Sequence, residues 1–163
     1  MAHLQLQQST IEGVARSIVE RRLIRTLVDA GALVIVTGGG GIPVARTPKG
    51  LLKGVEGVID KDFASALLAI NLRADVFMIS TAVERVALRW GKPEQRWIDT
   101  MTLAEAKERL AEGTHFAPGS MAPKIEACIE FLEHTGGEAI ISSPDVSRSS
   151  RCTSSISLVS GRI

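Results

Sequence analysis

The stretch from residue 32 to residue 62 most constrains the fold, because an apolar segment runs directly into four consecutive glycines. The segment Ala32–Thr37 is short, rich in β-branched residues and bounded by turn formers, a pattern that predicts a buried β-strand. Glycines have no side chain to keep a ligand away, so their backbone N–H groups can close around an anion. The candidate phosphate-binding loop consists of Gly38, Gly39, Gly40 and Gly41.

A lysine follows at the predicted start of a helix. Asp60 has the side chain of a helix N-cap. Apolar residues recur behind it at helical spacing, at Phe63, Ala66, Leu67 and Ile70. The free N–H groups and the dipole at a helix start favour negative charge, and Lys61 adds a cation there. Strand, glycine loop and lysine together indicate phosphate chemistry.

The rest of the chain alternates between strand and helix patterns. Residues 75–80 and 138–143 are apolar runs that predict two further strands, and strand–helix–strand units usually place their strands in parallel. Predicted helices cover residues 18–30 and begin again at a capping box formed by Thr102 and Glu105. We therefore expect an α/β fold with a mainly parallel sheet.

Two further patterns lie between and after these elements. Alternating apolar residues on either side of residues 91–95 predict a β-hairpin. The loop at residues 115–124 leads into a helix whose predicted core face is Ile125, Cys128, Ile129 and Leu132. Since Cys128 lies on this face, we expect it to be an inert packing residue.

Composition narrows the class of partner. The chain has 163 residues, of which 45% are apolar and 23% charged, as in an ordinary globular domain. A net charge of +1 offers no general attraction to nucleic acid or to a membrane surface, so we expect small-molecule substrates. No run approaches the roughly 18 apolar residues of a membrane span, and we expect a cytoplasmic protein.

Cysteines and histidines predict no metal site. Cys128 and Cys152 have neither metal-ligand spacing nor a disulfide framework. His115 and His134 have no partner carboxylate or second histidine at ligand spacing, so we expect both at the surface or in packing.

The two ends of the chain differ from its body. Residues 1–15 are polar and weakly patterned, and they stay unassigned, whereas residues 16–143 carry all the patterns above. Residues 144–163 include seven serines and have no helical period, which predicts disorder or poor packing.

The glycine loop by itself admits several interpretations. A plain tight turn is one; a P-loop is excluded because no Gly-Lys-Ser/Thr follows, and the residues after the glycines do not open a helix, as a dinucleotide site requires. Lys61 and Lys124 both lie near predicted helix starts, where they would offset charge on transferring phosphoryl oxygens. Asp62 could orient a lysine, hold Mg²⁺ through water or cap the helix.

Four segments resemble carbamate kinase, a member of the amino-acid kinase superfamily. They are residues 37–44 (Thr-Gly-Gly-Gly-Gly-Ile-Pro-Val), 57–62 (Gly-Val-Ile-Asp-Lys-Asp), 90–93 (Trp-Gly-Lys-Pro) and 115–124 (His-Phe-Ala-Pro-Gly-Ser-Met-Ala-Pro-Lys). They occur in the family's order, and the similarity runs from about Arg16 to Ser143. A chance match or a remote sister enzyme would seldom contain all four segments, so together they are specific for this family.

The resemblance implies a three-layer αβα sandwich and reversible phosphoryl transfer from ATP to carbamate, giving ADP and carbamoyl phosphate with Mg²⁺. Lys61 would be a catalytic lysine, Asp62 would orient the lysines, and the four glycines would lie by the transferring group. Lys124 would reach the nucleotide phosphates. The residues bordering the nucleotide would be Ser80, Thr81, Met121 and Lys124. The family typically works as a homodimer.

The resemblance also implies that the sequence corresponds to the C-terminal, nucleotide-side portion of the enzyme. The family has an N-terminal half that holds carbamate and a further lysine, and nothing in residues 1–15 resembles it. Besides a carbamate kinase, we therefore consider a nucleotide-binding fragment without turnover and a sister kinase acting on another carboxylate or on a nucleoside monophosphate. A dinucleotide-dependent oxidoreductase is least favoured, because the glycine spacing does not match one.

Overall fold

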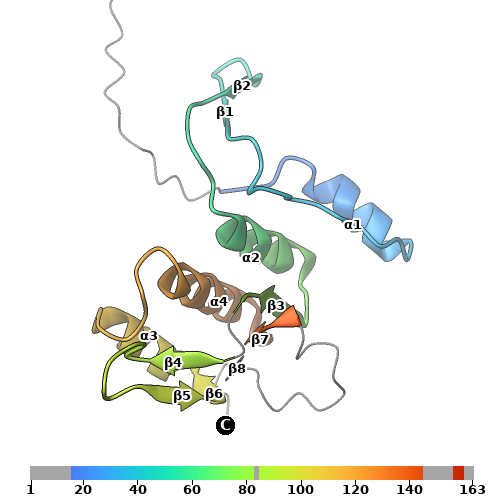
Figure 1. Cartoon of the computed structure of the whole chain (residues 1–163). Helices are drawn as coiled ribbons and strands as arrows, with labels where there is room; N and C mark the ends of the chain where they lie inside the picture. The colour runs from blue at the N-terminus through green and yellow to red at the C-terminus, as the bar shows by residue number, and fades with distance from the viewer. Residues whose placement is uncertain (1–15, 83–84, 145–155, 160–163) are drawn as a thin grey trace, which may run out of the picture.

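A computed structural model describes residues 16–82, 85–144 and 156–159 of the chain, and all structural statements below concern these residues. Their helices are α1 (Arg21–Asp29), α2 (Lys61–Leu72), α3 (Leu103–Ala111) and α4 (Met121–Thr135). Their strands are β1 (Val44–Arg46), β2 (Leu52–Gly54), β3 (Val76–Ser80), β4 (Val86–Leu88), β5 (Arg96–Ile98), β6 (Thr100–Thr102), β7 (Glu138–Ser142) and β8 (Ile156–Val159). Figure 1 shows their arrangement, with α2 above α4 and α4 beside β3 and β7 of the main sheet.

The main sheet has four strands in the order β3-β7-β8-β6. Strands β3 and β7 are parallel, as are β6 and β8, whereas β7 and β8 run antiparallel. The expected α/β class is confirmed, with a mixed sheet. The strands predicted at residues 75–80 and 138–143 are β3 and β7, which lie side by side as a parallel pair.

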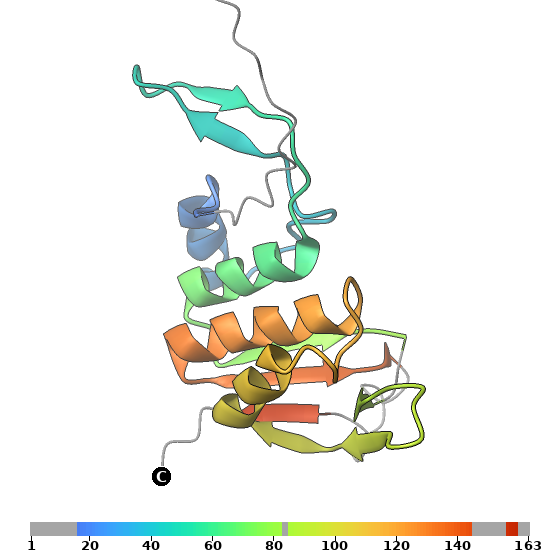
Figure 2. The ribbon, with the colours of Figure 1, turned by 90° about the vertical axis from the view of Figure 1, so that its left-hand side faces the viewer.

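One face of this sheet forms the core of the protein. Its buried side chains come from all four strands: Phe77, Ile79, Met101, Ala139, Ile141 and Leu158. Helix α4 lies along this core (Figure 2), and its predicted core face is confirmed, because Ile125, Cys128, Ile129 and Leu132 are all buried. Helix α4 also packs against α2, and a hydrogen bond from Lys124 to Asp62 holds their first turns together.

The opposite face of the sheet is only partly covered. In β3, buried Phe77 and Ile79 alternate with Val76 and Met78, whose exposed fractions are 48% and 49%. Strands of parallel sheets usually have both faces covered, so this half-exposed apolar face is unusual. It makes β3, the terminal strand of the sheet, accessible from one face and along its outer edge.

The strand predicted at Ala32–Thr37 does not form, and the prediction of a parallel pair with residues 75–80 is wrong. The segment has no strand partner among the described residues, and Leu33 and Ile35 are 95% and 92% exposed. An apolar β-branched run becomes a buried strand only where a neighbouring strand and a covering layer are present. Figure 1 shows the segment running back alongside α1 before it reaches β1.

The expectation of poor packing at the C-terminal end is wrong for residues 156–159. This short apolar run is strand β8, which lies between β7 and β6, and its Leu158 is fully buried. The prediction failed here because it was based on the serine content of the whole segment, which does not reveal a strand of four residues. Residues 145–155 and 160–163, including Cys152, lie outside the described residues, as do residues 1–15.

Local capping signals predicted the helix boundaries well. The carboxylate of Asp60 accepts hydrogen bonds from the backbone N–H groups of Asp62 and Phe63, so Asp60 caps α2. Thr102 and Glu105 form the predicted capping box at the start of α3. Helix α1 covers most of the predicted residues 18–30, and none of the helices in the described ranges is long and apolar enough to span a membrane.

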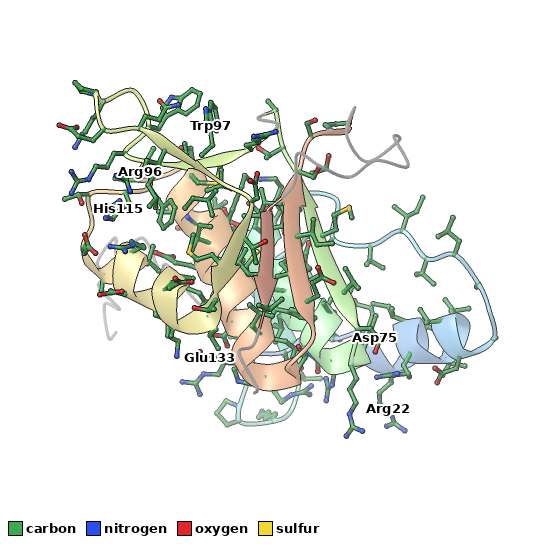
Figure 3. The ribbon with its side chains drawn as sticks, turned by 90° about the horizontal axis from the view of Figure 1, so that it is seen from below. Arg22, Asp75, Arg96, Trp97, His115 and Glu133 are labelled. Atoms are coloured by element: carbon green, nitrogen blue, oxygen red, sulfur yellow. The ribbon has the colours of Figure 1, made fainter. Side chains whose placement is uncertain are left out.

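Two antiparallel hairpins extend from this body. Strands β1 and β2 form one, which projects beyond α2 in Figure 2 and was not predicted. Strands β4 and β5 form the other, as predicted, and in it the rings of Trp90 and Trp97 meet edge to face at 5.5 Å. Figure 3 shows Trp97 and Arg96 at this hairpin, on the same side of the molecule as His115.

Candidate functional site

A cavity of about 240 Å³ lies where the glycine loop, the start of α2 and the end of β3 meet. The three elements come together here because β3 ends, and α2 begins, on the same side of the sheet. Its polar lining consists of Thr37, Gly38, Lys61, Asp62, Ser65 and Ser80. Carboxyl ends of strands and starts of helices are where α/β proteins bind anionic ligands.

Asp62, which lines this cavity, belongs to a buried ion pair. The Lys124 Nζ atom of α4 donates a hydrogen bond of 2.6 Å to Oδ2 of Asp62, in the first turn of α2. The side chains are only 15% and 10% exposed, so water screens the pair little. Because Asp60 supplies the helix cap, the Asp62 carboxylate is left to hold a lysine.

Lys61 differs from Lys124 in its exposure. Its Nζ atom lies 3.8 Å from Oδ1 of Asp62, and its side chain is 61% exposed. One carboxylate therefore contacts two ammonium groups, one fixed and buried and the other free to reach into the cavity. The first turn of α2 and the first turn of α4 thus deliver two positive charges to one place.

The four glycines have different surroundings. Gly38 lines the cavity, whereas Gly39, Gly40 and Gly41 do not. Gly40 has a φ of +90°, and a Cβ atom there would overlap the carbonyl oxygen of Ile59. Gly40 therefore allows the loop to pack against the residues that lead into α2, while Gly38 faces the space that a ligand would enter.

Thr37 opens the glycine loop in an unusual conformation. Its φ is +58°, a value that a β-branched residue rarely adopts, and its carbonyl accepts a hydrogen bond of 2.8 Å from Gly40. Such strain costs about 1–3 kcal/mol and concentrates at functional sites. The turn from Thr37 to Gly40 brings the apolar segment to the cavity wall.

The other predicted nucleotide-site residues are divided between two places. Ser80 lines the cavity, and Thr81 next to it is held by a 2.9 Å hydrogen bond from its N–H to the carbonyl of Ser142. Met121 lies in a second cavity of about 100 Å³, under the β4–β5 hairpin, together with Trp90 and His115. The first turn of α4 therefore places Met121 in the second cavity and Lys124 against Asp62, a residue of the first cavity.

Ser65 did not stand out in the sequence, although it lines the first cavity. It lies four residues after Lys61 on α2, and residues at this spacing share a helix face. Its spacing from Lys61 is therefore the feature of the sequence from which Ser65 could have been predicted as a site residue.

Both histidines have carboxylate partners, contrary to the expectation from the sequence. His115 is buried, and its Nε2 atom lies 2.7 Å from Oε2 of Glu112. The hydrogen bond to His115 is the main cause that lowers the pKa of the Glu112 carboxyl below its usual value. His134 lies 3.5 Å from Oε1 of Glu130, one turn earlier on α4. Each carboxylate partner is only three or four residues away in the chain. The positions expected for the histidines are confirmed, because His115 is packed in the interior and His134 lies at the surface.

Cys128 lies on α4, one turn after Lys124, and is fully buried. Burial, reinforced by the negative charge of Asp62, raises the pKa of its thiol to about 12, and Lys124 partly opposes this. The thiol is therefore protonated and unreactive at neutral pH, in agreement with a packing role. Among the described residues no group of three or more histidine, cysteine or acidic side chains could hold a metal ion.

Comparison with known proteins finds relatives of this chain among the carbamate kinases. The chain is 47% identical over 130 residues to the carbamate kinase-like protein YahI of Escherichia coli, covering 80% of this chain and 41% of that protein. It is 48% identical over 127 residues to the carbamate kinase of Thermococcus kodakarensis, covering 78% and 40%. The chain thus spans about 40% of the length of these relatives.

Solved structures agree with the sequence comparison. A carbamate kinase from Giardia lamblia bound to AMP-PNP superposes with a TM-score of 0.83 and 40% identity, over 88% of this chain and 50% of that one. An N-acetylglutamate synthase from Neisseria gonorrhoeae, at 18% identity and a TM-score of 0.60, shares the fold alone. Residues 3–143 match the amino acid kinase family. The chain therefore belongs to the amino acid kinase family, with carbamate kinases among its relatives.

Proposed function

We propose that this chain forms the nucleotide- and phosphoryl-binding portion of a carbamate kinase-type phosphotransferase. The reaction would be the reversible transfer of the terminal phosphoryl group of ATP to carbamate, giving ADP and carbamoyl phosphate. The observation that carries the proposal is that Asp62, which lines the cavity together with Lys61, is hydrogen-bonded to Lys124. Two cations held at a glycine loop suit a transferring phosphoryl group.

Each residue would have a distinct part in this transfer. Lys61, the exposed ammonium group, would approach the transferring phosphoryl oxygens and offset their charge. Asp62 would keep Lys124 in place, so that its position is set before the ligand arrives. The backbone N–H groups around Gly38 would face the phosphoryl group, and Ser80, Thr81 and Met121 would border the nucleotide.

ATP or ADP with Mg²⁺ is the cofactor that this proposal requires. The described residues offer no cluster of three metal-ligating side chains, and both carboxylate oxygens of Asp62 contact lysines. Mg²⁺ would therefore arrive with the nucleotide phosphates, and Asp62 could reach it only through water, as Mg²⁺ sites commonly allow. When bound with the nucleotide, Mg²⁺ would supply positive charge to the phosphoryl oxygens, in addition to the charge of Lys61.

The finer aspects of the fold and assembly belong to the same proposal. The half-exposed face of the sheet at Val76 and Met78 is where the second helical layer of a three-layer αβα sandwich would pack. A homodimer and a cytoplasmic location stay predictions, for which relatedness to the carbamate kinases is the support.

Calorimetric titration of the purified chain with Mg-ADP, followed by addition of carbamoyl phosphate and an assay for ATP, tests the proposal. We expect Mg-ADP to bind and ATP to form. Binding without ATP would instead identify the second candidate, a nucleotide-binding fragment without turnover, which the partial coverage of the relatives favours. Absence of binding would contradict both. A panel of other carboxylates and nucleoside monophosphates, offered with Mg-ATP, would reveal a sister kinase.

A further inference from the structure

We propose that the side-chain amine of Lys61 is a covalent modification site, carbamoylated by the acyl phosphate that the cavity beside it would bind. The reagent is carbamoyl phosphate, and the product is a carbamoyl-lysine, whose urea group is neutral. The inference rests on the proposed function, because carbamoyl phosphate has to enter this cavity. It goes beyond that function, because the reaction modifies the protein itself.

The first support is the accessibility of the Lys61 amine. Lys61 lines the cavity of about 240 Å³, and its side chain is 61% exposed. Its Nζ atom lies 3.8 Å from Oδ1 of Asp62, which is longer than a hydrogen bond. The side chain is therefore able to turn into the cavity and to bring its amine to a bound electrophile.

The second support is the contrast with the neighbouring lysine. Lys124 donates a hydrogen bond of 2.6 Å to Oδ2 of Asp62, and its side chain is only 15% exposed. To react, its amine would have to give up this hydrogen bond inside the protein, which costs free energy. Of the two cations at this place, Lys61 is therefore the one that an acyl phosphate can modify.

The third support is the connectivity of the reagent. In carbamoyl phosphate, a single bridging oxygen joins the phosphorus atom to the carbonyl carbon. A lysine that offsets charge on the phosphoryl oxygens therefore lies close to that carbon as well. Holding an amine beside an electrophile raises its effective concentration far above that of an amine in solution. The part proposed for Lys61 in phosphoryl transfer thus also exposes its amine to carbamoylation.

The reaction transfers the carbamoyl group from oxygen to nitrogen. The lone pair of the neutral Nζ atom attacks the carbonyl carbon, and a nitrogen–carbon bond forms. The bond from that carbon to the bridging oxygen breaks, and its electron pair leaves with the phosphate. The proton lost by the nitrogen goes to the released phosphate. The products are carbamoyl-lysine and inorganic phosphate, and the reaction needs no oxidant or reductant.

The modification would inactivate the site. It replaces a cation with a neutral group where the phosphoryl oxygens need positive charge. Phosphotransfer by the modified protein should therefore fall by about 100-fold or more, as it would if the cation were removed by substitution. Carbamoyl phosphate that accumulates without ADP to accept its phosphoryl group would thus stop the protein that makes it.

Peptide mass spectrometry of the full chain tests the proposal. The purified chain is incubated at pH 8.5 with carbamoyl phosphate, and the carbamoylated fraction of each lysine is followed with time. Lys61 should react about tenfold or more faster than Lys49 and Lys53, two exposed lysines that do not line the cavity, and Lys124 should stay unmodified. Inorganic phosphate, which competes for the phosphoryl position, should slow the reaction of Lys61 and leave that of Lys53 unchanged.

Potassium cyanate is the control reagent, because carbamoyl phosphate releases cyanate in solution and cyanate carbamoylates accessible amines in general. With cyanate, Lys61 should react at a rate similar to those of Lys49 and Lys53. A parallel assay for ATP formation from Mg-ADP and carbamoyl phosphate reports on the proposed function by itself. ATP formation without preferential modification of Lys61 would contradict this inference alone, whereas modification without ATP formation would support it and contradict turnover by this chain.

Two results would overturn the proposal. The first is carbamoylation of Lys61 at the same rate as Lys49 and Lys53, which would show a reaction with free cyanate only. The second is an equal preference for Lys61 with potassium cyanate, which would show a reactive amine that needs no acyl phosphate bound beside it.

Discussion

Lys124 donates a 2.6 Å hydrogen bond to Asp62 across 62 residues of chain, and this buried ion pair joins the first turns of α2 and α4. Neither residue could be replaced alone without leaving a charge in a poorly hydrated place. The pair therefore has two consequences that can be separated by experiment, one for folding and one for the charge at the cavity.

Lys124→Met should lower the free energy of unfolding by about 3 kcal/mol, because the Asp62 carboxylate then stays buried with only the exposed Lys61 ammonium group, 3.8 Å away, as a partner. Urea unfolding measures the loss. The double variant Asp62→Asn, Lys124→Met should recover most of that stability, because it removes both charges, and still lack phosphotransfer. If the double variant were as unstable as the sum of the two single variants, the ion pair would not be what connects the helices.

Lys61→Ala should leave stability within about 0.5 kcal/mol of the wild type, because the side chain is largely exposed. Loss of its cation should reduce ATP formation from ADP and carbamoyl phosphate by about 100-fold or more. Lys53→Ala, at another exposed lysine, is the control and should retain the wild-type rate. An unchanged rate in Lys61→Ala would remove Lys61 from the mechanism.

Gly40→Ala should destabilise the protein by about 2–4 kcal/mol, because a methyl group there overlaps the Ile59 carbonyl and the φ of +90° is strained for alanine. Gly39→Ala should cost less than about 1 kcal/mol, since Gly39 has neither constraint. Thermal unfolding of the two variants side by side measures the difference. Equal melting temperatures would show that the loop does not pack against Ile59 in solution.

The raised pKa of Cys128 predicts a loss of stability in alkali. The thiol ionises near pH 9.0 in the unfolded chain and near pH 12 in the folded one, so its effect is absent below pH 9 and favours unfolding between pH 9 and pH 12. Over that range stability should fall by about 1.4 kcal/mol per pH unit more than in Cys128→Ala. Urea titrations of the wild type and of Cys128→Ala at pH 8, 9 and 10 measure how the free energy of unfolding changes with pH. The same pH dependence in both proteins would contradict the burial of the thiol.

The capping box at α3 predicts that the stability of the protein decreases at acidic pH. Hydrogen bonds from the backbone N–H of Thr102 and then from its hydroxyl lower the pKa of Glu105 below 4.5. Its stabilising effect is therefore complete above pH 4.5 and disappears as the pH falls through the lowered pKa. Glu105→Gln should lower the melting temperature at pH 7 but not at pH 2.5. Glu108→Gln on the same helix should cause no such pH-dependent difference.

The elements that could be predicted from sequence are those specified by neighbouring residues. Asp60 caps α2 and Thr102 caps α3 through contacts within three residues, and the β4–β5 hairpin depends on its own turn. The two errors concern strands with distant partners. Whether Ala32–Thr37 or Ile156–Val159 becomes a strand depends on what lies beside it in space.

The candidate site could be predicted in part for the same reason. Lys61 and Asp62 are adjacent in the chain, and their place at a helix start follows from the Asp60 cap. Which glycine faces the cavity depends on how the loop packs against Ile59, a contact made across almost twenty residues. The hydrogen bond from Lys124 to Asp62 likewise depends on the packing of α4 on α2, which the sequence does not reveal.

The edge-to-face pair on the β4–β5 hairpin gives the protein an internal optical probe. Trp90 and Trp97 are the two tryptophans of the chain, and the sequence contains no tyrosine. Emission excited at the red edge of indole absorption therefore originates entirely from one hairpin. Because Trp90 borders the second cavity and the glycine loop contains no fluorophore, a spectral change on adding a ligand would report events beneath this hairpin, at the Met121 end of α4.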